Sequence, residues 1–108
     1  MEKERLVRFY QAAIDQCPNI ELKGRNLLYT SDNGHMFSVI NKDGQLGVRF
    51  SKAIQEAYFK KFETTQFMSY GAKMKGYITI SESILEDTDL LASLLMEAHA
   101  YVLGLPPK

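Results

Sequence analysis

Two short turn segments constrain this chain more than any other feature of its sequence. Ser31–Gly34 and Asn41–Gly44 both end in glycine and are rich in asparagine and aspartate, residue types that accept the positive φ angles of tight β-hairpin turns. The stretches around them are rich in β-forming residues, and residues 45–50 alternate between apolar side chains and polar or small ones. This spacing predicts a three-stranded antiparallel meander over residues 27–50.

Helical patterns precede and follow the meander. Residues 2–16 carry apolar side chains at spacings of three and four, and Pro18 ends that pattern because a proline disfavours helix in the residue before it. Ser51 is a capping residue type just before a second helical pattern that begins at Lys52. A third helical pattern ends at Gly104, followed by proline.

The region between the second and third helical patterns is harder to read. Residues 63–75 show no regular period, and residues 76–80 read as one short strand. We therefore predict the order α-β-β-β-α-β-α in a single domain of residues 1–108. The predicted class is α+β, two-layer, with one antiparallel sheet covered by helices.

Charge and cysteine content limit the classes of partner and compartment. Lys and Arg number 13, as do Asp and Glu, so the net charge is zero, whereas nucleic-acid-binding proteins usually carry a basic excess. We expect no nucleic-acid partner. The single cysteine, Cys17, cannot form an internal disulfide, which favours a cytoplasmic location. No run approaches the roughly 18 apolar residues of a membrane helix, and the first residues lack the apolar core of a signal peptide, so we expect no membrane partner.

Residue types that carry chemistry are scattered along the chain. His35, His99 and Cys17 have no metal-ligand spacing, so we expect neither a metal nor a cofactor. Cys17 lies at the end of the first predicted helix, where the helix dipole disfavours a thiolate, so a buried structural thiol is predicted. The acidic residues within 86–89 precede the last helix, where carboxylates favour helix capping. The sequence therefore predicts no enzyme activity.

One glycine-and-lysine segment has the composition of a binding loop. Its candidate ligand-binding residues are Tyr70, Gly71, Lys73, Lys75, Gly76 and Tyr77. Glycine loops with lysine can hold phosphate, although this pattern matches neither the P-loop nor the dinucleotide-binding fingerprint. Two interpretations stay open: a structural turn whose tyrosines pack on the sheet, and a site for an anionic partner.

Apolar positions and turns from about Leu28 to Leu105 also form a family-like pattern. Its parts are Tyr29, Gly34–Ile40, Leu46–Arg49, Phe62, Phe67–Gly71, Leu85–Asp87 and Ala98–Ala100. This pattern resembles the N-terminal domain of the TfoX competence-regulator family, whose glycine-rich opening motif is reduced here to Lys23-Gly24-Arg25. The resemblance implies a compact α+β scaffold, a non-enzymatic regulatory or protein-interaction role, and no catalytic residues.

Two functions from different classes are therefore expected. The first is a non-catalytic regulatory or protein-interaction module resembling the TfoX N-terminal domain, with another protein as its partner. The alternative is a small-ligand or anion-binding domain that uses the loop between Tyr70 and Tyr77.

Self-association is a separate expectation. A sheet with helices on one face leaves its other face and its edges open, and a net charge of zero offers little electrostatic protection. We predict a homodimer whose interface includes the apolar residues assigned to outward positions: Tyr29, Phe37, Phe59 and Tyr77.

Overall fold

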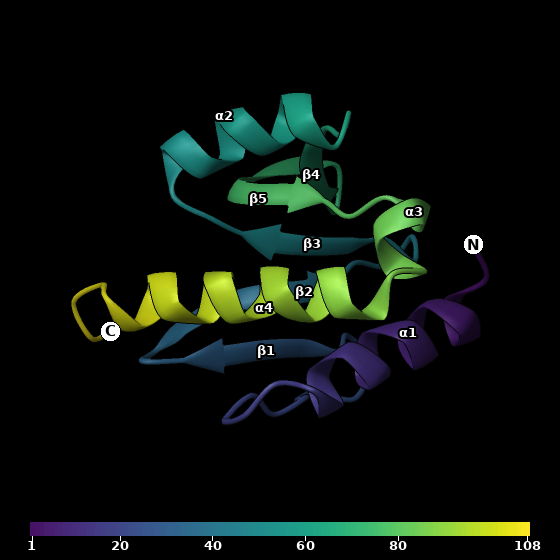
Figure 1. Ribbon diagram of the computed structural model, residues 1–108, viewed down its shortest axis with the longest axis horizontal. Helices are drawn as coiled ribbons and strands as arrows, with labels where there is room; N and C mark the ends of the chain where they lie inside the picture. The colour runs from purple at the N-terminus through teal and green to yellow at the C-terminus, as the bar shows by residue number, and fades with distance from the viewer.

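The structure, a computed structural model, describes residues 1–108 and confirms the predicted two-layer α+β class. One five-stranded antiparallel sheet, in the order β1-β2-β3-β5-β4, carries its helices on one face (Figure 1). The elements are α1 (Lys3–Asp15), β1 (Tyr29–Asp32), β2 (His35–Ile40), β3 (Leu46–Arg49), α2 (Lys52–Lys61), β4 (Gln66–Ser69), β5 (Ala72–Thr79), α3 (Glu82–Leu85) and α4 (Thr88–Leu103).

Strands β1, β2 and β3 form the predicted meander. Asp32 pairs with His35 across a two-residue turn, in which Asn33 and Gly34 have φ angles of 55° and 79°. Positive φ at both central residues is the requirement of the tight hairpin turn whose twist matches that of its strands. The turn chemistry read from the sequence therefore sets this register.

An irregularity in β2 changes which side chains face the helices. Thr30 pairs with Ser38 and the next residue of β1 pairs with Met36, so Phe37 is an extra residue in β2. The Phe37 ring is 1% exposed and stacks on the His99 ring of α4. The expectation that Phe37 faces outward in a dimer interface is therefore wrong, because the bulge turns it into the core.

The segment 63–75, predicted to be irregular, contains a strand. Ser69 pairs with Ala72 across a second two-residue turn, in which Tyr70 and Gly71 have φ angles of 52° and 76°. This turn joins β4 to β5, and β5 begins four residues before the short strand predicted at 76–80. The observed order α-β-β-β-α-β-β-α-α thus adds β4 and the short helix α3 to the predicted one.

Helices α1 and α4 pack against each other on one face of the sheet, and α2 packs on β5 (Figure 1). Their apolar sides and that face of the sheet enclose the main core. The predicted caps are present. The Ser51 side chain accepts a hydrogen bond from the amide of Ile54, and the Asp87 carboxylate accepts one from the amide of Leu90 at 3.1 Å.

The face of the sheet opposite the helices is partly covered by the sheet itself. Val39, Phe67 and Tyr77 form a second, smaller buried cluster there. Two hydrogen bonds hold the β4–β5 hairpin in a curled position: the Asn41 amide donates to the carbonyl of Met68 at 2.7 Å, and the Tyr77 hydroxyl donates to the carbonyl of Met36 at 2.7 Å. The open face assumed for the predicted homodimer is therefore much reduced.

Candidate functional site

The six residues of the glycine-and-lysine segment lie along a β-hairpin and do not converge on one site. Tyr70 and Gly71 form its tip, where the Tyr70 side chain is 67% exposed. The Lys42 ammonium lies 5.5 Å from the centroid of the Tyr70 ring. Lys73 follows the tip with its side chain in solvent. This part of the segment is a tight turn, but the exposed Tyr70 ring does not pack on the sheet as the structural-turn interpretation expects.

Tyr77 belongs to the second cluster and has no free surface for a ligand. The residue is 5% exposed, and its hydroxyl donates to the carbonyl of Met36. Burial raises the pKa of the Tyr77 hydroxyl to about 12, so the side chain is neutral across the physiological range. Tyr77 therefore supports the fold rather than forming the wall of a binding loop.

Lys75 and Gly76 contribute to a different feature, a groove between the start of α2, the middle of β5 and the end of α4. We call it the basic groove; its volume is about 630 Å³. Its lining residues are Arg49, Phe50, Lys52, Gln55, Gln66, Lys75, Gly76 and Tyr101. Three of these are cations and none carries a carboxylate. The sequence did not identify three of the lining residues as site residues: Arg49, Lys52 and Tyr101. No sequence motif links them to Lys75 and Gly76.

The exposed face of α4 is a second unusual surface. Ser93, Met96, Ala100 and Leu103 follow one another at spacings of three and four, and all are exposed. Met96 is 40% exposed and Leu103 is 51% exposed. We call these four residues the α4 stripe. In Figure 1 this helix lies at the front of the molecule, between α2 and α1.

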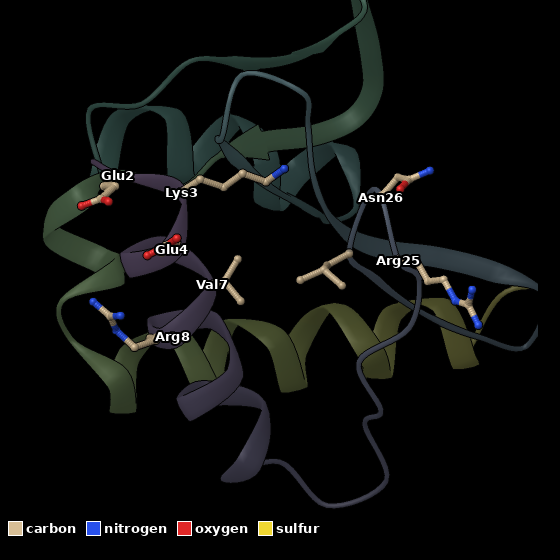
Figure 2. A pocket seen from close by; sticks show the side chains of 8 residues that line it. Glu2, Lys3, Glu4, Val7, Arg8, Arg25 and Asn26 are labelled. Carbon is tan, nitrogen blue, oxygen red and sulfur yellow. The ribbon is translucent and has the colours of Figure 1, made fainter.

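The largest groove lies between the start of α1 and the segment before β1, with a volume of about 730 Å³. In Figure 2, Lys3 extends across the groove from the α1 side, whereas Glu2 and Arg8 point away from the groove on that side and Arg25 points away on the other. Its lining residues are Glu2, Lys3, Glu4, Val7, Arg8, Arg25, Asn26 and Leu28. Charges of both signs in divergent orientations give this groove no defined ligand chemistry.

His99 forms a pair with Asp32 rather than with the neighbours in its own helix. The His99 Nε2 atom lies 2.7 Å from an Asp32 carboxylate oxygen. Glu97, which is close to His99 in the same helix, accepts a hydrogen bond from the Tyr58 hydroxyl at 2.6 Å. The hydrogen bond from His99 holds the pKa of Asp32 below its usual range. The side-chain amide of the adjacent Asn33 donates hydrogen bonds to the backbone carbonyls of Val102 and Leu105. This cluster attaches the β1–β2 turn to the end of α4.

Cys17 is buried, as predicted. Its thiol donates to the carbonyl of Ala13 at 3.3 Å and lies 3.5 Å from the carbonyl of Ala92, and burial raises its pKa. A thiol with a raised pKa is a poor nucleophile at neutral pH. The role of Cys17 is therefore structural, and its contacts link α1 to α4. The structure has no group of three or more His, Cys, Asp and Glu side chains that could hold a metal ion.

The remaining residues of the predicted dimer interface have mixed positions. Tyr29 and Phe59 are half-buried, and each packs on one of the two hydrophobic clusters. Tyr77 is buried, as described above. The homodimer itself stays a prediction, without the large aromatic surface on which it was based.

Comparison with known proteins adds no family assignment. The sequence matches no protein-family model and no curated protein. The resemblance to the TfoX N-terminal domain stays a prediction. None of the helices combines the length and apolar character needed to cross a membrane.

Proposed function

We propose that this chain is a non-catalytic protein-interaction module, in the role that the TfoX-like pattern implies, and that it binds its partner through the α4 stripe. The observation that carries the proposal is the composition of α4. Of its sixteen residues only Asp89 and Glu97 carry carboxylates, and none is Lys or Arg. Apolar side chains that are normally buried share its solvent-facing side with the two carboxylates; the exposed residues are Asp89, Ser93, Met96, Glu97, Ala100 and Leu103.

The stripe has the pattern of a helix-docking surface. Ser93 and Ala100 are small and allow close approach, while Met96 and Leu103 supply apolar contact area. An amphipathic helix recognises such a surface through apolar residues at the same three-and-four spacing. Methionine suits this role because its flexible side chain adapts to different partners.

The charges beside the stripe indicate the character of the partner. Arg5 and Arg8 of α1 border a groove of about 400 Å³ that reaches Thr88 at the start of α4. On the other side, the Lys61 ammonium lies 5.8 Å from the ring of Tyr58, the residue that contacts α4. Arg5 pairs with Glu86 at 3.7 Å, whereas Arg8 and Lys61 have no carboxylate partner. These two cations, one on each flank, favour an amphipathic helix with acidic edges. We therefore assign this kind of helix, from another protein, as the occupant.

Affinity capture from the native host, followed by cross-linking, tests the proposal. Met96→Glu and Leu103→Glu place a carboxylate in the stripe and should abolish capture of a specific partner, whose cross-linked segment should be an acidic amphipathic helix. Ala53→Glu on α2 is the matched control, because Ala53 is also exposed but lies outside the stripe. A synthetic peptide of that segment should then bind the wild type and the control, but neither stripe variant.

Four results would contradict the proposal. The partner could remain bound to both stripe variants, or its cross-links could map to another face. Alternatively, light scattering could show a dimer of this chain that Met96→Glu dissociates, which would assign the stripe to a second copy. Reproducible enzymatic activity of the pure protein, lost on a point substitution, would contradict the non-catalytic assignment.

A further inference from the structure

Three cations from three different elements meet at the basic groove. Arg49 is at the end of β3, Lys52 is the first residue of α2, and Lys75 is in the middle of β5. The ion pairs of the structure involve the N-terminal amine, Arg5 and His99, so none of the three groove cations has a carboxylate partner. Three like charges beside one cavity repel one another, and an anion placed between them removes that repulsion.

The two glutamine side-chain amides of the groove are already engaged, whereas the Tyr101 hydroxyl makes no hydrogen bond within the chain. The Gln55 side-chain amide donates to the carbonyl of Phe50 at 2.9 Å, and the Gln66 amide donates to the carbonyls of Met74 and Tyr77 at 2.8 and 3.1 Å. The hydrogen-bond donors left for a ligand therefore belong mainly to the three cations. Donors of this kind select a ligand by its negative charge.

Tyr101 gives the groove an aromatic wall. The Arg49 guanidinium lies 5.7 Å from the centroid of the Tyr101 ring, a cation–π contact that restricts its orientation. A guanidinium held in this way can bind two oxygens of a phosphate at once, whereas the flexible lysines act as point charges. The ring beside it offers an apolar surface to the organic part of a ligand.

We propose that the basic groove binds a small organic phosphate monoester. Its dianionic head matches the charge of Arg49, Lys52 and Lys75, and its organic part lies along Tyr101. A cavity of about 630 Å³ is in the size range of small-ligand sites. The proposal relocates the anion site expected between Tyr70 and Tyr77. It retains Lys75 and Gly76 and excludes Tyr70, Lys73 and Tyr77. It is independent of the α4 stripe, so either proposal can fail alone.

Calorimetric titration with phenyl phosphate and with inorganic phosphate tests the site. We expect one phenyl phosphate per chain, and weaker binding of inorganic phosphate because it lacks the ring. Lys52→Ala and Lys75→Ala should each weaken phenyl phosphate binding about tenfold, since a hydrogen bond to a charged group contributes about 1.5 kcal/mol or more. Both lysines are exposed, so both variants should fold as the wild type does.

Lys73→Ala is the matched control. Lys73 is an exposed lysine two residues from Lys75 on the same strand, but it does not line the groove. Its substitution should leave the affinity unchanged. The proposal is overturned if the wild type binds neither probe at millimolar concentration, or if Lys73→Ala weakens binding as much as Lys75→Ala does. Stronger binding of a single-stranded oligonucleotide, increasing with its length, would also overturn the small-ligand assignment.

Discussion

The ring of Phe67 lies directly on the backbone of Gly47, although their strands are not neighbours in the sheet. Phe67 is on β4 and Gly47 is on β3, with β5 between them. A Cβ atom added at Gly47 would lie 2.5 Å from the Cγ atom of Phe67. The contact exists because the β4–β5 hairpin curls over the face opposite the helices, and the missing side chain of Gly47 leaves room for the ring.

Substitution of Gly47 should therefore disturb the curl. Gly47→Ala forces a methyl group against a fully buried ring, and such overpacking typically costs about 1–3 kcal/mol. We expect a loss of that size in the free energy of unfolding, measured by urea denaturation. Gly104→Ala is the control, because the nearest atom to its added Cβ is 3.5 Å away. A Gly47→Ala variant as stable as the wild type would show that the hairpin can move away from β3.

The turn at Tyr70 and Gly71 should be open to stabilisation. Tyr70 has a φ angle of 52°, a conformation that costs most residues roughly 1 kcal/mol or more but that asparagine accepts more readily. Tyr70→Asn also removes the exposed contact with Lys42, which contributes about 0.5 kcal/mol. The relief of strain should exceed this loss, so we expect a higher melting temperature. Lys42→Ala measures the loss of the contact with Lys42 alone. A Tyr70→Asn variant less stable than the wild type would show that the Tyr70 ring stabilises the fold by more than its backbone strain destabilises it.

The residues at the turn also explain why the β1–β2 hairpin could be predicted from the sequence and the β4–β5 hairpin could not. Asn33-Gly34 is a familiar turn pair and correctly predicts the boundary between β1 and β2. Tyr70-Gly71 adopts nearly the same backbone angles, but tyrosine is uncommon at positive φ, so β4 was missed. The bulge that turns Phe37 inward has no local sequence signal either, because it depends on packing against α4.

The candidate site was predicted only in part, for a related reason. Lys75 and Gly76 were identified because they are close together in a conspicuous segment. No binding motif in the sequence contains Arg49, Lys52 or Tyr101. They come together only because β3 pairs with β5 and the end of α4 lies beside that pair. Tertiary convergence of this kind leaves no spacing for a motif search to detect.

The pair of His99 and Asp32 should give stability a defined acid dependence. The folded protein lowers the pKa of Asp32 below its unfolded value of roughly 3.9, chiefly through the hydrogen bond from His99. The resulting stabilisation is present above that unfolded value and is lost as the pH falls through the lowered folded pKa. Asp32→Asn should therefore be less stable than the wild type at neutral pH, and the difference should shrink below about pH 4. Denaturation across this range checks the prediction, and a difference that persists unchanged at low pH would refute it.

Tyr10 should set the alkaline limit of stability. Its hydroxyl lies 2.5 Å from the Ser38 hydroxyl, which is also 2.5 Å from the Thr30 hydroxyl, in a fully buried network beneath α1. Burial raises the pKa of Tyr10 well above its usual value, because the phenolate would lose its contact with water. Stability that depends on the protonated form is complete below the unfolded pKa of about 10 and falls as the pH rises above it.

Tyr10→Phe removes this titrating group and tests the alkaline prediction. At neutral pH it should cost about 1 kcal/mol, since Ser38 keeps Thr30 as its partner. Above about pH 10 its stability should fall less steeply than that of the wild type, with a residual slope from Tyr58 and Tyr77, whose pKa values are both raised to about 12. Tyr70→Phe changes an exposed hydroxyl and is the control for chemical effects of high pH. Equal alkaline slopes for wild type and Tyr10→Phe would mean that the buried network opens to water before Tyr10 ionises.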